Sequence, residues 1–295
     1  MSEVLAEAAW RASEQAHHAR IDAATASHRE RAQRAKKHPV EDFMFTYYSY
    51  RPAQLRSWHP GIGIRLEGAS ERSAWKSYHY DGTAAYVDPD AFLSRKSQLL
   101  AFASELLHQT EQRPAQFGCF GLHEWAMVYR LQSDDRRHPE WPLRLGATGT
   151  DAVVEAHHLK CTHIDAYRFF TPPARPLNLL TPQRETQTAM EQPGCLHANM
   201  DLYKWAHKLA PAVSSDLIAD CFELARDIRV LDMRASPYDL AELGIAPLTI
   251  ETTDGKAAYA RAQQAFALRA ATLRSELLDA CQRIADHSSE SLGAG

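Results

Sequence analysis

Long runs of helix-forming residues constrain the fold of this chain more than any other feature. Residues 3–37 are dominated by Ala, Glu, Arg and Gln, and Pro39 ends the run. Asp88 and Pro89 suit the cap and first turn of a helix that is expected to reach about Thr110, and apolar residues recur along it at helical spacing. Further helices are expected over 195–210, 214–232 and 255–286.

Short strands are expected between the first two helices. Asp81-Gly82 lies between alternating segments within 61–87, which is a strong hairpin signal. The sequence therefore predicts an α+β fold, mostly α-helical with a few short β-strands and hairpins, in a single compact domain of residues 1–295. The polar loop 132–149, which contains prolines and glycines, is the best candidate for an internal boundary.

Composition predicts the cellular compartment of the protein and the charge of its partners. The five cysteines are scattered and form no CxxC pair, which is typical of reduced thiols in a cytoplasm. The N-terminus lacks the positive start and apolar core of a signal peptide, and no run of about 18 apolar residues predicts a membrane span. We therefore expect a cytoplasmic protein with no membrane contact. The formal charge of −4 gives no global attraction to nucleic acid, and the fifteen histidines favour a site rich in imidazole.

The segment 157–170, HHLKCTHIDAYRFF, has the densest set of reactive side chains. From Leu159 onward it is aromatic-rich and free of Gly and Pro, which predicts a strand. Side chains alternate faces along a strand, so one face is expected to carry Cys161, His163, Asp165 and Tyr167.

That face has three interpretations. Cys, His and carboxylate together are a candidate zinc or iron set, with His158, Cys161 and His163 as ligands. The face could equally hold a substrate through hydrogen bonds. In the third interpretation it is a buried network whose polar groups satisfy one another.

A second stretch, 191–208, is expected to face the first. If CLHANMDLYKWAHK is helical, His197 and Asp201 share a face, with Lys204 and Trp205 near it. Asp201 could orient the imidazole or act as an acid or base, and the amides after Pro193-Gly194 could bind an anion. The alternative is a capped helix with an ordinary (i, i+4) pair.

A third motif, GLHEWAMVY, places Glu124 beside Trp125 in an apolar segment. Desolvation there is expected to raise the pKa of the Glu124 carboxyl, as suits a general acid or base. The alternative is a structural hydrogen-bond partner. No GxGxxG motif, Walker loop, GxSxG elbow or kinase set occurs, which removes the common nucleotide, hydrolase and kinase readings.

Two N-terminal segments bear on a nucleic-acid ligand. Residues 28–38 carry five Lys and Arg residues against Glu30, and they either form a solvated helix face or contact phosphates. Residues 43–58 are rich in aromatic rings, including Tyr47. Such rings suit a flat ligand such as a nucleobase, or they pack the first helix against the core.

Five motifs occur along the chain: HPVEDFMFTYYSYRPAQLRSWHPG, GLHEWAMVY, HIDAYRFFTPPARPLN, EQPGCLHANMDLYKWA and ASPYDL. Together they resemble a group of bacterial proteins commonly labelled 3-methyladenine DNA glycosylases, over roughly residues 15–275. The resemblance implies excision of an alkylated base in DNA repair. That chemistry needs a flipped-out nucleotide, aromatic rings that stack on a cationic base, and a carboxylate that stabilises an oxocarbenium-like state.

The first functional hypothesis is therefore an N-glycosidic-bond hydrolase that acts on a modified purine base or nucleoside, or on DNA held through segment 28–38. Asp201 is the expected principal carboxylate, with Glu124 and Asp165 as further catalytic candidates. The expected substrate-binding residues are His163, His197, Tyr47, Trp125, Tyr167, Arg168, Lys204 and Trp205.

Two other hypotheses belong to different classes. One is a metal-dependent hydrolase or oxygenase that binds zinc or iron through His158, Cys161 and His163, with His123 or His197 as a further ligand. The other is a small-molecule-binding protein without catalysis.

Overall fold

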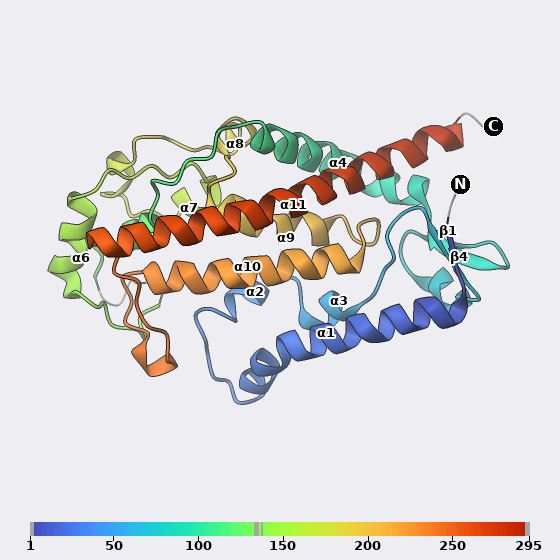
Figure 1. Cartoon of the computed structure of the whole chain (residues 1–295), viewed down its shortest axis with the longest axis horizontal. Coiled ribbons are helices and arrows are strands. Elements are labelled where there is room, and N and C mark those ends of the chain that lie inside the picture. Colours follow the sequence, from blue (N-terminus) through green and yellow to red (C-terminus); the bar gives the residue numbers. More distant parts are fainter. Residues whose placement is uncertain (1–2, 133–135, 137, 293–295) are drawn as a thin grey trace. The chain divides into compact units, whose positions relative to one another are not determined.

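The computed structural model describes residues 3–132, 136 and 138–292, with side chains as far as His287. The described chain is mostly helical with one small sheet, so the expected fold class is confirmed (Figure 1). The chain divides into two compact units. Unit 1 comprises Met1–His108, Leu202–Glu223 and Thr272–Gly295, and unit 2 comprises Gln109–Asp201 and Leu224–Ala271.

The five expected long helices are confirmed, and shorter ones accompany them. The first needs a correction, because Glu3–Leu5 form a strand and the helix begins at Glu7. Within the described ranges, no helix is both long and apolar enough to cross a bilayer. The α-helices are α1 (Glu7–Gln33), α2 (Phe43–Thr46), α3 (Pro52–Arg56), α4 (Pro89–Glu111), α5 (Leu122–Ala126), α6 (Gly146–Glu155), α7 (Ile164–Tyr167), α8 (Gln187–Met190), α9 (Leu196–Lys208), α10 (Ser215–Ala235) and α11 (Thr253–Leu292), and the 3-10 helices are η1 (Ser70–Ala74), η3 (Arg175–Leu177) and η4 (Ala241–Leu243).

Unit 1 contains a four-stranded sheet formed by β1 (Glu3–Leu5), β2 (Ile64–Glu67), β3 (Tyr78–Tyr80) and β4 (Ala84–Val87). The strand order is β1-β2-β4-β3, with β1 parallel to β2 and the other pairs antiparallel. Strands β3 and β4 are the predicted hairpin. Asp81 Oδ1 accepts hydrogen bonds from the amides of Thr83 (2.9 Å) and Ala84 (3.0 Å), and Gly82 adopts a positive φ of 95°. The turn signal read from the sequence is thus confirmed.

Two buried side chains tie α1 to the rest of unit 1. The Trp10 ring is fully buried, and its indole Nε1 donates to the carbonyl of Glu67 in β2 at 2.9 Å. Arg72 is also buried, and its guanidinium donates to the carbonyl of Trp58 (2.6 Å) and to Glu14 Oε1 in α1 (2.5 Å). Because both polar groups are hydrogen-bonded, their burial does not leave an uncompensated donor or charge in the core.

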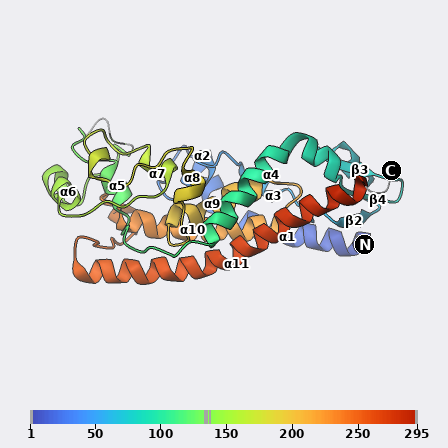
Figure 2. The same cartoon turned by 90° about the horizontal axis from the view of Figure 1, so that it is seen from above.

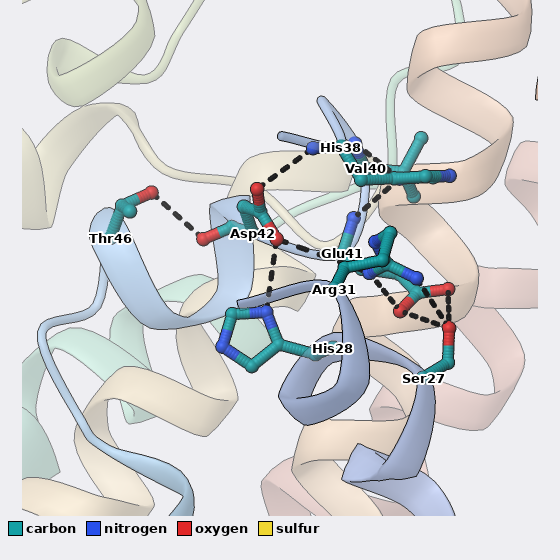
Figure 3. A network of polar contacts seen from close by, with 8 residues as sticks. All are labelled: Ser27, His28, Arg31, His38, Val40, Glu41, Asp42 and Thr46. Carbon is teal, nitrogen blue, oxygen red and sulfur yellow. Dashed lines mark hydrogen bonds and ion pairs between the residues drawn. The ribbon is translucent and has the colours of Figure 1, made fainter. Parts of the chain in front are cut away.

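The end of α1 carries the basic segment 28–38, and Figure 3 shows the contacts that surround it. Arg31 pairs with Glu41 at 2.5 Å, and His28 Nδ1 lies 2.9 Å from Asp42 Oδ1. The second oxygen of Asp42 accepts a hydrogen bond from the backbone of residue 38 at 2.8 Å. The segment is therefore folded back onto the acidic residues that follow it.

Two other arginines of this segment also have acidic partners within α1. Arg29 lies 3.2 Å from Asp22, and Arg34 lies 3.0 Å from Glu30. Because these charges are already offset inside unit 1, the segment has less positive charge to offer a phosphate backbone than its composition suggests. Contact with DNA through this segment stays a prediction.

The strand predicted from Leu159 to residue 170, which lies in unit 2, is wrong. Only a bridge between Leu159 and Asn178 forms there, and residues Ile164–Tyr167 form the short helix α7 (Figure 2). The side chain of Asn178 accepts from the amide of Cys161 (2.7 Å) and donates to its carbonyl (3.0 Å). One amide side chain thus satisfies the backbone groups that a neighbouring strand would pair, so the alternating face does not form.

Candidate metal centre

His123 and Asp232 form a buried contact in unit 2. His123 lies in α5, which begins after Gly121 in a left-handed conformation (φ 71°), and Asp232 lies near the end of α10. His123 Nε2 and Asp232 Oδ1 are 2.8 Å apart. Burial by itself lowers the pKa of His123, but the Asp232 carboxylate outweighs it, and the pKa is raised well above its ordinary value. Without another cation, His123 is therefore protonated.

A second imidazole lies beside this pair. His197, in the first turn of α9, has its ring centroid 4.4 Å from that of His123, at 82° between the planes. One ligand atom from each of His123, His197 and Asp232 lies within 4.8 Å of the other two, and all three residues are buried. Burial lowers the pKa of His197 well below its ordinary value, and the charge on His123 lowers it further. His197 is thus a neutral base with a lone pair that a cation could use.

Arg229 holds the carboxylate of this group in place. It is buried in α10, and its NH1 donates to Asp232 Oδ2 (2.9 Å) and to Glu124 Oε1 (2.7 Å). The expectation of a raised pKa for Glu124 is wrong. Burial does act to raise the pKa, but the charges of Arg229 and His123 prevail and lower it to about 2. Glu124 is therefore ionised at neutral pH and cannot serve as a general acid.

A further imidazole with two carboxylates adjoins His197. His163 Nε2 lies 3.3 Å from Glu191 Oε1 and 3.4 Å from Asp201 Oδ2, and all three side chains are at most 3% exposed. The His163 ring centroid is 5.4 Å from that of His197. The structure thus brings together three residues that the sequence singled out, His163, His197 and Asp201.

A small cavity of about 10 Å³ adjoins the ligand group, since His123 and His197 both line it. That volume is about the room that one water molecule needs. Cys161 and Cys195 line it too, and burial raises the pKa of Cys161 well above its ordinary value and that of Cys195 to about 12. These two sulfurs are therefore thiols in the metal-free protein.

The three ligands predicted from the sequence, His158, Cys161 and His163, do not form one site. His158 is exposed, whereas Cys161 and His163 are buried. The Cys161 thiol donates to the carbonyl of His163 at 3.5 Å. Among the residues that the structure describes, the group at ligand distance consists of His123, His197 and Asp232 instead.

The remaining predicted residues of unit 2 lie outside the ligand group. Asp165 is buried and pairs with Arg184 at 2.5 Å and with Arg168 at 3.6 Å. Trp125 is fully buried, with Nε1 donating to a backbone carbonyl at 2.8 Å, so its ring is core and not an open stacking surface. Tyr167 packs on a neighbouring phenylalanine with ring centroids 5.2 Å apart.

Three predicted substrate residues belong to unit 1. Tyr47 stacks on Phe43 with ring centroids 4.8 Å apart. Trp205 is buried beside Phe102, and the ammonium of Lys204 lies 4.8 Å from the centre of the Trp205 ring. Each of these side chains thus has a packing role within unit 1.

Sequence reasoning missed Asp232, Arg229 and Glu191. The signal available for the first two was a pair of opposite charges three positions apart, in a helix that carries several other charged residues. Glu191 precedes the Pro193 turn and carries no pattern of its own. Its position beside His163 comes from the fold alone.

No family model matches the chain, and neither a curated protein nor a solved structure matches it. The resemblance to the proteins labelled 3-methyladenine DNA glycosylases therefore stays a prediction.

Proposed function

We propose that unit 2 contains the centre of a metal-dependent enzyme, a hydrolase or an oxygenase, with His123, His197 and Asp232 as the protein ligands. The observation that carries the proposal is that their three ligand atoms lie within 4.8 Å of one another in a buried site. Ligand bonds to zinc are about 2.0–2.2 Å long, so donors on one ion lie about 3–4 Å apart. Small side-chain shifts would therefore seat a cation.

The donor types support zinc or iron. Two imidazoles and one carboxylate bind zinc in hydrolytic enzymes, and the same set binds non-haem iron in oxygenases. Arg229 supports the set because it donates a hydrogen bond to Asp232 Oδ2 and so leaves Oδ1 for the contact with His123.

The protonation of the two imidazoles predicts how a bound cation would depend on pH. A protonated His123 places positive charge 4.4 Å from the ring of His197, and that charge acts on the pKa of His197. A bound divalent cation would replace the proton on His123, so that both imidazoles share one positive centre. Metal binding should accordingly release protons and tighten as the pH rises.

The test is elemental analysis of tag-free protein by plasma mass spectrometry, with Zn, Fe, Mn, Cu and Ni read together. Wild-type protein should hold close to one metal per chain, and His197→Asn and Asp232→Asn should lose most of it. His158→Asn is the matched control, because His158 is exposed and lies in the segment first expected to supply ligands. A metal-free wild type, or metal lost from His158→Asn alone, would refute this ligand set.

A second candidate is the N-glycosidic-bond hydrolase that the sequence motifs suggest. The observation in its favour is Asp201, a carboxylate with 1% exposure that lies 3.4 Å from His163. Base release from alkylated DNA and from free nucleosides should then be lost in a folded Asp201→Asn protein. Activity that survives this substitution would end the assignment. Tight binding of a nucleoside without turnover by the metal-loaded wild type would instead support the non-catalytic binder.

A further inference from the structure

Two residues that line the 10 Å³ cavity each have a polar atom that needs a partner. The hydroxyl of Tyr259 and Oε1 of Gln263 are buried, and within the described chain neither has a hydrogen-bond partner. Both side chains are 0% exposed, and they lie one helical turn apart on α11. A buried polar group without a partner is costly, so an occupant of the cavity that bonds both would stabilise the site.

The orientation of Gln263 determines what that occupant can be. Its Nε2 donates to the carbonyl of Gly194 at 2.6 Å. A carbonyl oxygen only accepts, so the amide cannot be flipped, and Oε1 is the amide atom left to bond an occupant of the cavity. Because Oε1 also only accepts, the occupant has to donate a hydrogen. The Tyr259 hydroxyl can complete the arrangement by donating to the occupant.

We propose that the cavity binds one water molecule, which donates to Gln263 Oε1 and accepts from the Tyr259 hydroxyl beside His123 and His197. The inference rests on the proposed metal centre and supplies it with the nucleophile that hydrolysis needs. Dioxygen has no hydrogen to donate to Gln263, whereas water has two. In hydrolysis the water oxygen bonds to the substrate, the leaving group departs with its electron pair, and the two water protons end on the products.

Fluoride is a suitable probe because it has the size of hydroxide and no hydrogen. In protein reconstituted with Co²⁺, fluoride would face the lone pairs of Gln263 Oε1 but still accept from Tyr259. Gln263→Leu should therefore bind fluoride at least about fivefold more tightly than wild type, and Tyr259→Phe at least about fivefold more weakly. The Co²⁺ absorption spectrum reports both loading and fluoride binding. A merely structural effect would move both variants in the same direction.

The outcomes separate the two proposals. Failure of wild-type protein to take up Co²⁺ overturns the metal centre itself. Normal Co²⁺ uptake with fluoride affinities that do not shift in opposite directions overturns the water site alone. If Gln263→Leu does not fold, a crystal structure of the Co²⁺-loaded wild type decides. An oxygen within hydrogen-bond distance of both Gln263 Oε1 and the Tyr259 hydroxyl supports the proposal, and its absence overturns it.

Discussion

Replacing Arg229 with methionine tests the buried network that holds the candidate site. Arg229 is buried and joins Glu124 to Asp232, so its loss leaves Glu124 without its ion-pair partner and Asp232 with His123 alone. Removing one partner of such a pair costs about 3–5 kcal/mol. Burial raises the pKa of Glu124, and the Arg229 charge is the largest of the influences that lower it to about 2, so the expected loss of stability has the right sign.

The assay is urea unfolding of chelator-treated protein at pH 7, followed by circular dichroism, so that bound metal does not contribute to stability. Arg269→Met is the matched control, since Arg269 forms a 2.9 Å ion pair with Asp227 at side-chain exposures of 50% and 41%. The control should lose less than about 1 kcal/mol. If Arg229→Met loses no more than Arg269→Met, the reasoning about the buried network is refuted.

The same variant has a pH signature. The pKa of Glu124 is lower in the folded protein than in the unfolded chain, so its contribution to stability is complete above pH 4.5 and disappears as the pH falls toward 2. Arg229→Met should lose this part of the acid dependence, and Arg269→Met should keep it.

Three further predictions concern stability. Burial and nearby positive charge lower the pKa of His59 to about 3, so between pH 7 and pH 5 the imidazole takes up a proton in the unfolded chain but not in the folded protein. The free energy of unfolding should therefore fall by about 1–2 kcal/mol over that range. His59→Asn should show a smaller fall when urea unfolding is measured at both pH values. Asp88 Oδ1 accepts from the amides of residues 90 and 91 at 2.9 and 3.1 Å, so Asp88→Ala should cost about 1 kcal/mol, and an unchanged urea midpoint would contradict this cap. A Cβ at Gly194 would overlap the carbonyl oxygen of Gln116, so Gly194→Ala should destabilise the protein by about 1–3 kcal/mol in the same assay, and a stability gain would contradict this packing.

Local signals in the sequence predicted much of the secondary structure. The Asp88-Pro89 start of α4 and the Asp81-Gly82 turn depend on contacts within a few residues, so they can be read from the chain directly. The segment from Leu159 was read wrongly, because the side chain of Asn178, far along the chain, satisfies its backbone. Strand propensity describes a fit to neighbours, and those neighbours were not visible in the sequence.

The candidate site was predictable only in part. The sequence singled out His163, His197 and Asp201, because imidazoles and carboxylates at helical or alternating spacing are easily seen. It also placed Glu124 in an apolar segment, and the structure confirms that this side chain is buried. The direction of its pKa shift was wrong because the compensating Arg229 lies on a distant helix.

The sequence by itself thus determined the helical segments, the hairpin and the supply of imidazole, because these follow from local spacing and composition. Only the tertiary structure decided which groups meet. It brought Asp232 of α10 to His123 of α5 and His197 of α9, and it placed Gln263 and Tyr259 of α11 on the same cavity. Contacts between residues distant in sequence depend on how helices pack, and no local pattern in the chain encodes that packing.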